Sequence, residues 1–393
     1  MAQWNRVPLI DYIELIGGGT PKTTVPEYWN GNIPWLSVKD FNNDKRYVYS
    51  TEKHISQSGF ENSPTKMLHK DDIIISARGT VGEIAMIPFD MAFNQSCYGI
   101  RASRGIDQPF LYYLLKNCIS QLKRMTHGSV FDTITRDTFA NIEVDIPDAE
   151  TQKRISSVLA DIDNKIEVND AINDNLEQQA QAFFQELFVD NADPEWAVGT
   201  ISDLGAVVGG STPSKAKPEY YTETGIAWIT PKDLSINKSK FISHGENDIT
   251  ELGLKNSSAT IMPEGTVLFS SRAPIGYIAV AAGEVTTNQG FKSIVPKPEI
   301  GTAFVYYFLK HNLPIIEGMA SGSTFKEVSG STMKGVPAVI PDTDTIARFN
   351  DFCTPIFAQQ RILEEQNQSL AVLRDNLLPK LMSGEIDVSD IQL

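Results

Sequence analysis

The sequence has little that would anchor the chain in a membrane, direct its export or cross-link it. No run of eighteen apolar residues occurs among its 393 residues, which excludes a membrane-spanning helix. The first six residues lack the charged segment followed by an apolar segment that marks a secretory signal. Cys97, Cys118 and Cys353 are odd in number and have no CxxC spacing, which argues against a disulfide framework and a zinc site. We therefore expect a protein of the reducing cytoplasm.

Signatures of common catalytic centres are also absent. Gly17–Lys22 has the wrong spacing for a phosphate-binding loop, and Pro21 would obstruct the helix that follows such a loop. The sequence has no GxSxG elbow, no GxGxxG between a strand and a helix, and no Asn/Asp-Pro-Pro-aromatic box. Its five histidines show neither CxxC nor HExxH pairing. We therefore expect no catalytic centre, no metal site and no cofactor in this chain.

What the sequence does contain is a long internal repeat. Gly18-Gly19-Thr20-Pro21 recurs as Gly210-Ser211-Thr212-Pro213, and later matches keep their order while the shift drifts from 192 to 194 residues. Further matched pairs are Trp35 with Trp228, Lys39-Asp40 with Lys232-Asp233, Ser76-Ala77-Arg78 with Ser270-Ser271-Arg272, Asn94-Gln95 with Asn288-Gln289, and Gly128-Ser129 with Gly322-Ser323. This ordered set indicates a tandem duplication.

Each copy has two parts that differ in amino-acid composition and in apolar pattern. The first is rich in Gly, Pro, Trp and Tyr and contains short β-type runs such as residues 72–76 and 265–270. The second, about residues 152–188 in the first copy, has almost no Gly or Pro, and its apolar residues recur at spacings of three and four. These apolar residues are Ile155, Leu159, Ile162, Ile166, Leu176, Ala180, Phe183 and Leu187, and in the second copy Phe349, Phe352, Ile356, Leu363, Leu370, Leu373, Leu377 and Leu381. Asp148 and Asp342 are the predicted helix starts, and Ser383-Gly384 is the predicted stop of the second helix.

A helix of this length extends over roughly 55 Å, and its single apolar stripe needs a partner of matching length. The helix of the other copy supplies one, and we expect the two to pack antiparallel as a coiled coil. The alternative, in which each helix packs back on its own globular part, is disfavoured because polar residues leave the stripe narrow. The sequence thus predicts an α+β fold, with two globular α/β domains in tandem that are separated by the two long helices.

The formal net charge of −15 is unevenly distributed. Residues 1–150 hold 15 Lys+Arg against 18 Asp+Glu, and residues 195–341 hold 12 against 13. The helical segments 151–194 and 342–393 hold 3 against 9 and 4 against 9. The overall acidity argues against a nucleic-acid partner, but it lies mainly in the helices. The near-neutral globular parts therefore remain compatible with such a partner.

Basic residues, hydroxyls and aromatics gather in the turn-rich stretches of both globular parts. Lys and Arg neutralise phosphates, Ser and Thr add hydrogen bonds to phosphates, and Arg reads base edges in the major groove. A solvated loop is the alternative for any single lysine, and core packing is the alternative for each tryptophan. The predicted DNA-binding residues are Thr20, Lys22, Trp35, Lys39, Lys45, Arg46, Arg78, Thr80 and Ser129 in the first copy, and Thr212, Lys215, Lys217, Trp228, Lys232, Arg272, Ser323 and Lys326 in the second.

These motifs together resemble the specificity (S) subunit of type I restriction-modification systems. The run Gly-Gly-Thr-Pro…Pro-Glu-Tyr-Trp…Ile-Pro-Trp…Lys-Asp at residues 18–40 is similar to the opening of a target-recognition domain, and residues 210–233 are similar to a second one. Residues 152–177 resemble the central conserved helical region of the family, and residues 377–386 resemble the distal one. The resemblance implies target-recognition domains at 1–148 and 195–341, and spacer helices within 149–194 and 342–393.

The resemblance implies a division of labour between subunits. Each target-recognition domain would read one half of a bipartite, asymmetric site in double-stranded DNA, and the helices would set the unread gap. Two methyltransferase (M) subunits would supply S-adenosylmethionine, and restriction (R) subunits would supply ATP- and Mg²⁺-dependent chemistry, so this chain itself would not be an enzyme. The implied M-subunit contacts are Gln152, Lys153, Asp163, Lys165, Glu167, Asn169, Asn173, Leu377, Pro379 and Lys380.

Three other functions stay open at this stage. A related fused restriction-methylation system uses similar recognition subunits. A duplicated scaffold that binds only proteins would carry the same repeat without recognising DNA. A compact methyltransferase or nuclease with unfamiliar motifs would bind its cofactor or metal by itself.

Overall fold

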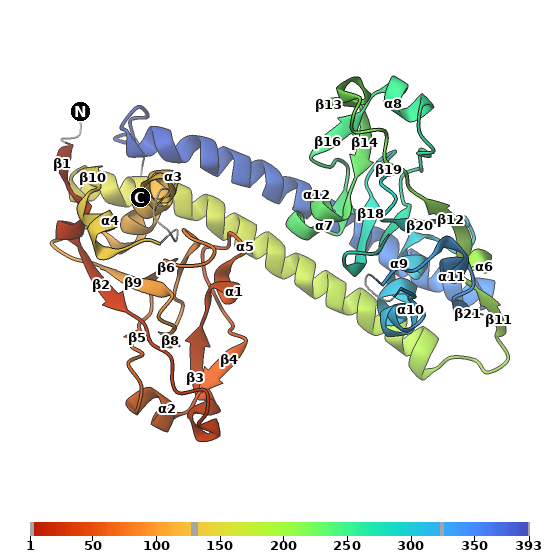
Figure 1. The fold of residues 1–393 in the computed structure, drawn as a ribbon, viewed down its shortest axis with the longest axis horizontal. Helices are drawn as coiled ribbons and strands as arrows, with labels where there is room; N and C mark the ends of the chain where they lie inside the picture. Colours follow the sequence, from red (N-terminus) through yellow and green to blue (C-terminus); the bar gives the residue numbers. More distant parts are fainter. Residues whose placement is uncertain (1–3, 127–132, 323–325, 392–393) are drawn as a thin grey trace. The chain divides into compact units, whose positions relative to one another are not determined.

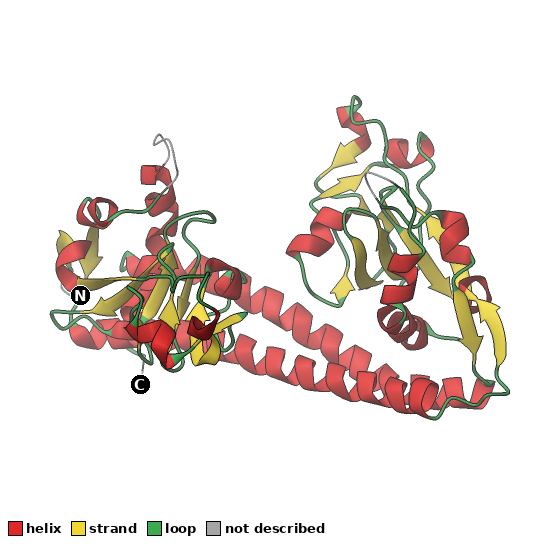
Figure 2. Cartoon of the chain, turned by 60° about the horizontal axis from the view of Figure 1, so that its bottom comes forward, coloured by secondary structure: helices red, strands yellow, loops and turns green. Residues whose placement is uncertain are grey.

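A computed structural model describes residues 4–126, 133–322 and 326–391 (Figure 1). The chain forms two compact units, one made of residues 1–168 with 367–393 and the other of residues 169–366. Both units mix helices and strands, as Figure 2 shows. The boundaries of the units fall inside the two long helices, α5 (Ala149–Gln185) and α12 (Thr343–Met382). Each unit therefore contains one globular part and a section of both helices. Among the described helices, none is long and apolar enough to cross a membrane.

The globular part of the first unit is built on two four-stranded sheets and a two-stranded ribbon. The first sheet is antiparallel, with the order β2 (Ile13–Gly17), β9 (Cys97–Ala102), β6 (Ile73–Ser76) and β7 (Ile84–Met86). The second has the order β4 (Lys53–Ile55), β3 (Trp29–Leu36), β8 (Met91–Phe93) and β5 (Met67–Leu68). The ribbon pairs β1 (Asn5–Pro8) with β10 (Glu143–Ile146). The helices are η1 (Leu9–Tyr12), η2 (Pro26–Tyr28), α1 (Val38–Phe41), α2 (Gln57–Glu61), α3 (Gln108–Thr126) and α4 (Arg136–Ala140).

The second unit repeats most of this order of elements, with an added strand in its larger sheet, which confirms the duplication and the strand predictions at 72–76 and 265–270. Its larger sheet has the order β12 (Gly205–Gly209), β20 (Lys292–Pro296), β17 (Val267–Ser271), β18 (Ile275–Ala281) and β15 (Phe241–Ile242). The smaller sheet has the order β13 (Tyr221–Thr222), β16 (Asn247–Ile249), β14 (Ile226–Ile229) and β19 (Thr286–Thr287), and the ribbon pairs β11 (Ala197–Thr200) with β21 (Pro337–Ile340). The helices are the π turn η3 (Glu186–Asp190), α6 (Ile201–Leu204), η4 (Pro218–Tyr220), α7 (Pro231–Ile236), α8 (Glu251–Lys255), α9 (Thr302–His311), α10 (Leu313–Gly318) and α11 (Gly330–Lys334).

The ends of the long helices follow local hydrogen bonding. The Asp148 carboxylate accepts the amide of Thr151 at 3.0 Å, and the Asp342 carboxylate accepts the amide of Thr345 at 2.8 Å, so both predicted helix starts are confirmed. Gly384 ends the second helix with a φ of 72°, a conformation that favours glycine. The range of about 152–188 that the apolar pattern gave lies about three residues too late at both ends, because α5 begins at Ala149, directly after the predicted start signal, and gives way after Gln185 to the π turn.

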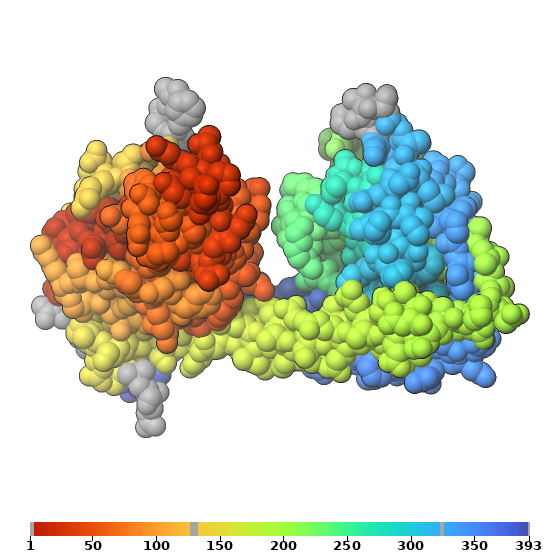
Figure 3. Space-filling view, turned by 90° about the horizontal axis from the view of Figure 1, so that it is seen from below, coloured from red at the N-terminus to blue at the C-terminus, as the bar shows by residue number. Residues whose placement is uncertain are grey.

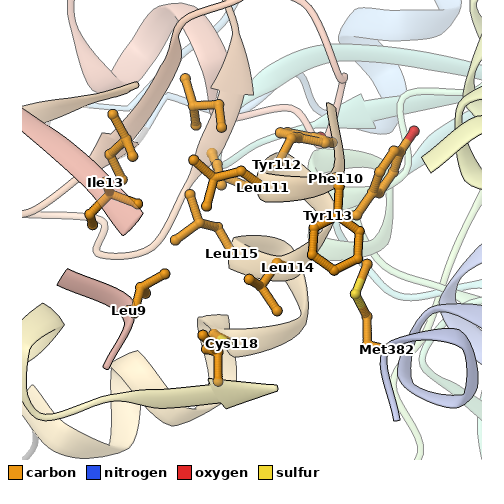
Figure 4. Packing of buried hydrophobic residues seen from close by; sticks show 14 of the residues in the cluster. Leu9, Ile13, Phe110, Leu111, Tyr112, Tyr113, Leu114, Leu115, Cys118 and Met382 are labelled. Carbon is orange, nitrogen blue, oxygen red and sulfur yellow. The ribbon is translucent and has the colours of Figure 1, made fainter. Parts of the chain in front are cut away.

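Both long helices are built into the core of each unit. In the first unit, Tyr113 and its neighbours on α3 pack with Ile155 and Leu159 of α5 and with Leu381 and Met382 of α12 (Figure 4). In the second unit, α9 packs against Phe184 of α5 and Phe349 of α12, whose ring centroids are 5.7 Å apart.

The helices pair antiparallel within each unit, because Asp163 contacts Arg374 in the first and Phe183 contacts Phe349 in the second. The antiparallel pairing is therefore confirmed. The apolar stripe of each helix packs against the globular cores as well as against the other helix. Phe352 and Leu373 of the predicted stripe remain 39% and 48% exposed.

A buried ion pair couples the helices in the first unit. Arg374 of α12 is 4% exposed, and its guanidinium lies 2.9 Å from the Asp163 carboxylate of α5 and 3.0 Å from Asp44. The Tyr113 hydroxyl donates to the other Asp163 oxygen at 2.7 Å. Burial opposes the charge of Arg374, but Asp375, Asp163 and Asp44 outweigh it and raise the pKa of the guanidinium.

The second unit has a buried network in which the signs of the charges are reversed, with a helix carboxylate between two cations. Glu177 of α5 is paired with Lys240 and Lys310, and the Tyr307 hydroxyl donates to it at 2.8 Å. Burial alone would raise the pKa of Glu177, yet Lys240 and Lys310 hold that pKa at about 2. Burial lowers the pKa of the Lys240 ammonium, although the charge of Glu177 opposes this shift. In acid Lys240 is already protonated, so Glu177 is the member of the pair whose charge changes as the pH falls.

Glu177 predicts a specific acid dependence of stability. The unfolded chain binds the proton near the ordinary pKa of 4.5 and the folded chain only near about 2, so the carboxylate stabilises the fold above pH 4.5 and this contribution is lost as the pH falls toward 2. We expect Glu177→Gln to lower the free energy of unfolding by on the order of 3 kcal/mol at neutral pH, and this difference to shrink through that window. Denaturant unfolding at a series of pH values measures it. Glu186→Gln, at an exposed position further along the chain, is the control that should change little.

Candidate nucleic-acid interface

Four segments of the first globular part come together as a surface that we call the first loop cluster (residues 17–22, 35–39, 76–83 and 94–96). The Trp35 indole N–H donates to the Gly19 carbonyl at 3.1 Å, and the Gly19 amide donates to the Phe93 carbonyl at 2.9 Å. The Thr20 hydroxyl donates to the Gln95 side chain. The glycine-rich loop is therefore tied to the strand end on one side and to the Asn94-Gln95 turn on the other.

The second unit forms the same contacts in a second loop cluster (residues 209–214, 228–232, 270–277 and 288–290). The Trp228 indole donates to the Ser211 carbonyl at 3.0 Å, and the Thr212 hydroxyl donates to Gln289. The residues that repeat in the sequence thus make the same hydrogen bonds in both copies. Trp35 and Trp228 are each 6% exposed, so they support these loops from inside.

Each Lys-Asp pair sits on a short capped helix. The Asp40 carboxylate accepts the amides of Ser37 at 2.7 Å and Glu52 at 2.8 Å, and it closes a capping box on α1. Asp233 does the same for α7 with the amides of Thr230 and Glu246. The aspartates thus stabilise these turns, and the neighbouring Lys39 and Lys232 are exposed, with Lys232 paired to Glu246.

A hydroxyl inside each arginine loop fixes its shape. The Ser76 hydroxyl donates to the Thr80 carbonyl at 2.5 Å and accepts the Glu83 amide at 2.8 Å. Ser270 makes the corresponding bonds to Pro274 and Tyr277, each at 2.8 Å. These turns leave Arg78 exposed and Arg272 half-buried at the surface of their clusters.

The first loop cluster encloses a surface hollow of about 370 Å³. It is lined by Trp35, Lys39, Asn42, Lys53, Arg78, Thr80 and Asn94, among others. The hollow brings together ammonium, guanidinium, hydroxyl and amide groups, which are the groups that contact phosphates and base edges, and it is also lined by one acidic residue, Glu52.

The predicted DNA-binding residues have different surroundings. Lys22, Lys39, Arg78, Thr80, Lys215, Lys217, Lys232 and Lys326 are exposed in or beside the clusters, and Lys45 is also exposed. Arg46 instead turns to α5, where its guanidinium lies 3.2 Å from Glu167 and also donates to Asn164. Ser129 and Ser323 lie outside the described residues. Sequence reasoning missed Lys53, because its counterpart in the second copy, Asn247, is not basic.

The predicted docking residues of the helices also fall into buried and exposed groups. Gln152 is buried, where it donates to the Pro147 carbonyl and accepts the Asp107 amide, each at 2.8 Å. Asp163 is held by Arg374, and the buried Asn169 donates to Gln366 at 3.4 Å. Lys153, Lys165, Pro379 and Lys380 are exposed, and Glu167, Asn173 and Leu377 are half-buried. Figure 3 shows one face of the yellow-green part of α5 at the surface.

Within the described part of the chain, no group of three or more His, Cys, Asp or Glu residues is placed to hold a metal ion. The fold and the two loop clusters define a duplicated α+β binding protein with the same loop framework in each copy. A family model for the type I restriction modification DNA specificity domain matches residues 1–178 and 194–371. The chain belongs to this family, as its motifs predicted.

Individual relatives agree with this assignment. The MjaIX specificity subunit of Methanocaldococcus jannaschii is 40% identical over 191 residues, which are 46% of this chain and 44% of that protein, so the match spans less than half of the relative. The HindI specificity subunit of Haemophilus influenzae is 26% identical over 356 residues, covering 70% of this chain and 77% of that one. A crystal structure of the S subunit from M. genitalium aligns with a TM-score of 0.60 at 16% identity, over 97% of this chain and 96% of the other. This last similarity confirms the predicted fold class.

Two adjacent glycines provide a test of the loop framework. A Cβ on Gly18 would lie 2.1 Å from the Asn94 carbonyl oxygen, whereas a Cβ on Gly17 would meet nothing within 4 Å. We expect Gly18→Ala to force the glycine-rich loop away from the Asn94-Gln95 turn and to cost about 1–3 kcal/mol, with Gly17→Ala nearly neutral. Thermal unfolding and hydrogen exchange of residues 17–22 measure the effect. Equal behaviour of the two variants would contradict the tight contact.

Proposed function

We propose that this chain is the DNA-recognition subunit of a type I restriction-modification complex, in which each globular part reads one half of a bipartite, asymmetric site. The observation that carries the proposal is the repetition of one loop framework, with exposed cations, in both copies of a chain that belongs to the specificity family. Two similar readers with different surface residues suit a site with two different halves. In this proposal residues 1–148 and 195–341 are the target-recognition domains.

The loop residues have distinct roles in this proposal. Lys39 and Lys53 neutralise phosphates at the rim of the first hollow, and Arg78 with Asn94 contacts base edges in the major groove. Thr20 and Trp35 fix the loops that carry these groups. Lys215, Lys217, Lys232 and Arg272 have the corresponding roles in the second copy.

The helices have the second role in this proposal. Segments 149–194 and 342–393 set the number of unread base pairs and dock methyltransferase subunits through exposed residues such as Lys153, Lys165 and Lys380. Those subunits bring S-adenosylmethionine and flip the target adenine, and restriction subunits add the ATP-dependent steps. The chain itself contributes no catalytic group.

Mapping the methylated adenines in host DNA tests the recognition role directly, because it gives both half-sites and their gap. Two different half-sites at a fixed separation are expected. A continuous site, or methylation that does not depend on this chain, would contradict the proposal.

The spacer role predicts the effect of an insertion. One extra heptad in both α5 and α12 adds about 10 Å of helix, or about three base pairs of DNA. We expect the unread gap to lengthen by about that amount while both half-sites stay the same, as read from the methylation pattern of the variant complex. A heptad of the same composition inserted after residue 391, beyond the helices, is the control. An unchanged gap in the helix variant would contradict the spacer role.

Single substitutions in the first loop cluster separate phosphate contacts from base contacts. We expect Lys39→Ala to weaken binding to all sequences and to reduce the salt dependence by about one ion, whereas Arg78→Ala should cost about 1–3 kcal/mol and relax one position of the half-site. Binding of the complex to a set of single-base variants at several salt concentrations measures both. Arg6→Ala, on β1 and outside the cluster, is the control. If Arg78→Ala behaves like this control, Arg78 does not contact a base and has only a structural role at the end of the strand.

A further inference from the structure

The two loop clusters share a framework but place different residues beside their arginines. The Ile134 amide donates to the Ala77 carbonyl at 3.0 Å, and the Val328 amide donates to the Ser271 carbonyl at 3.0 Å. These matching hydrogen bonds make Thr133 and Glu327 structurally equivalent. One stands next to Arg78 and the other next to Arg272.

Beside the second loop cluster, Glu327 lies between two cations, Arg272 of the cluster and Lys292. One of its carboxylate oxygens is 3.4 Å from the Arg272 guanidinium, and the other is 3.5 Å from the Lys292 ammonium. The ammonium also donates to the Gln289 carbonyl at 3.4 Å, which links the pair to the Asn288-Gln289 turn. Arg272 is therefore held by a carboxylate on the surface of its own unit.

In the first cluster, the corresponding arginine, Arg78, has no such partner among the described residues. Thr133 replaces the glutamate, and the position of Lys292 is taken by Tyr98. Arg78 is exposed and makes no ion pair with any residue that the structure describes.

The lysines of the short capped helices, Lys39 and Lys232, also differ in whether a carboxylate pairs with them. Lys232 is paired with Glu246 at 2.5 Å. Glu52 is the structural counterpart of Glu246, since each donates its amide to the capping aspartate. Over the described ranges, no ion pair joins Glu52 to Lys39. Lys39 and Arg78 of the first cluster thus make no ion pair with a described residue, although Glu52 also lines their hollow, whereas Lys232 and Arg272 of the second cluster are each paired with a carboxylate.

We propose that Glu327 is a specificity-determining residue that suppresses phosphate binding at Arg272, so that the first target-recognition domain carries most of the sequence-independent affinity for DNA. This inference rests on the proposed function. A phosphate approaching Arg272 carries the same charge as Glu327 and is repelled by it. A guanine edge is uncharged and offers two acceptors to the guanidinium, so it can bind beside the carboxylate. The ion pair is one-third exposed and correspondingly weak, so a base edge can open it.

Exchanging the two equivalent residues tests this inference. The full chain, assembled with its methyltransferase subunits, is titrated with a short duplex of random sequence at several salt concentrations. We expect Glu327→Thr and Glu327→Gln to steepen the salt dependence by about one ion and to raise affinity for this duplex by up to about tenfold at about 0.1 M salt. Thr133→Glu in the first domain should have the opposite effect on both quantities.

The controls separate this inference from the function on which it rests. Glu223→Gln, at an exposed position of the second unit outside the cluster, should leave the salt dependence unchanged. Thermal unfolding establishes that each variant is folded. If the wild-type complex binds DNA but neither Glu327 variant changes the salt dependence, the role of Glu327 is overturned while the recognition function stands. If the wild-type complex does not bind DNA at all, the recognition function itself is overturned.

Discussion

The structure depends on two buried charged residues, one on each long helix. Each helix follows one globular part in the sequence and places its charged residue in the core of the other unit. Arg374 of α12 enters the first unit, where it meets Asp163 and Asp44, and Glu177 of α5 enters the second, where it meets Lys240 and Lys310. Removing one member of such a pair leaves a buried charge without a partner, which costs several kcal/mol. The arrangement also differs between the units, because the arriving group is a cation in one and an anion in the other. The folded units therefore do not coincide with the sequence repeats, and each requires both helices.

The duplication has kept the framework of the loops and changed the groups that the framework presents. Trp35 and Trp228, Thr20 and Thr212, and the two capping aspartates make equivalent hydrogen bonds, because their donors and acceptors are needed to close the same turns. At the surface no such requirement acts. Thr133 and Glu327 occupy one framework position with different chemistry, as do Lys53 and Asn247. Under the proposed function, a domain that varies only these surface side chains would change the bases it recognises while its fold stays the same.

Much of the fold could be predicted from the sequence, because its signals are local or repeated. Asp148, Asp342 and Gly384 mark helix ends through hydrogen bonds and backbone conformation within one turn, and the repeat identified the shared loops. The burial of polar residues could not be predicted in this way. Gln152, Asp163 and Asn169 are polar and lie on a helix with a narrow apolar stripe, so they resembled surface residues. Asp163 is buried because Arg374 pairs with it across 211 residues of sequence, and no local pattern reports such a partner. Their placement leaves the exposed Lys153, Lys165 and Lys380 as the better candidates for contacts with other subunits.

The net charge of −15 fits a DNA-recognition protein once it is divided by location. Glu177 and Asp163 are neutralised by buried cations, so part of the helix acidity never reaches the surface. The exposed remainder lies on segments that would repel a phosphate backbone, since like charges in water still interact over about 10 Å at ordinary salt. In the proposed function, repulsion along the helices would confine DNA contacts to the loop clusters, just as the proposed role of Glu327 would confine Arg272 to uncharged partners. Acidity placed in this way would lower the non-specific affinity for DNA and leave the proposed base-contacting residues unchanged, and a protein that must find one site among many depends on the difference between specific and non-specific affinity.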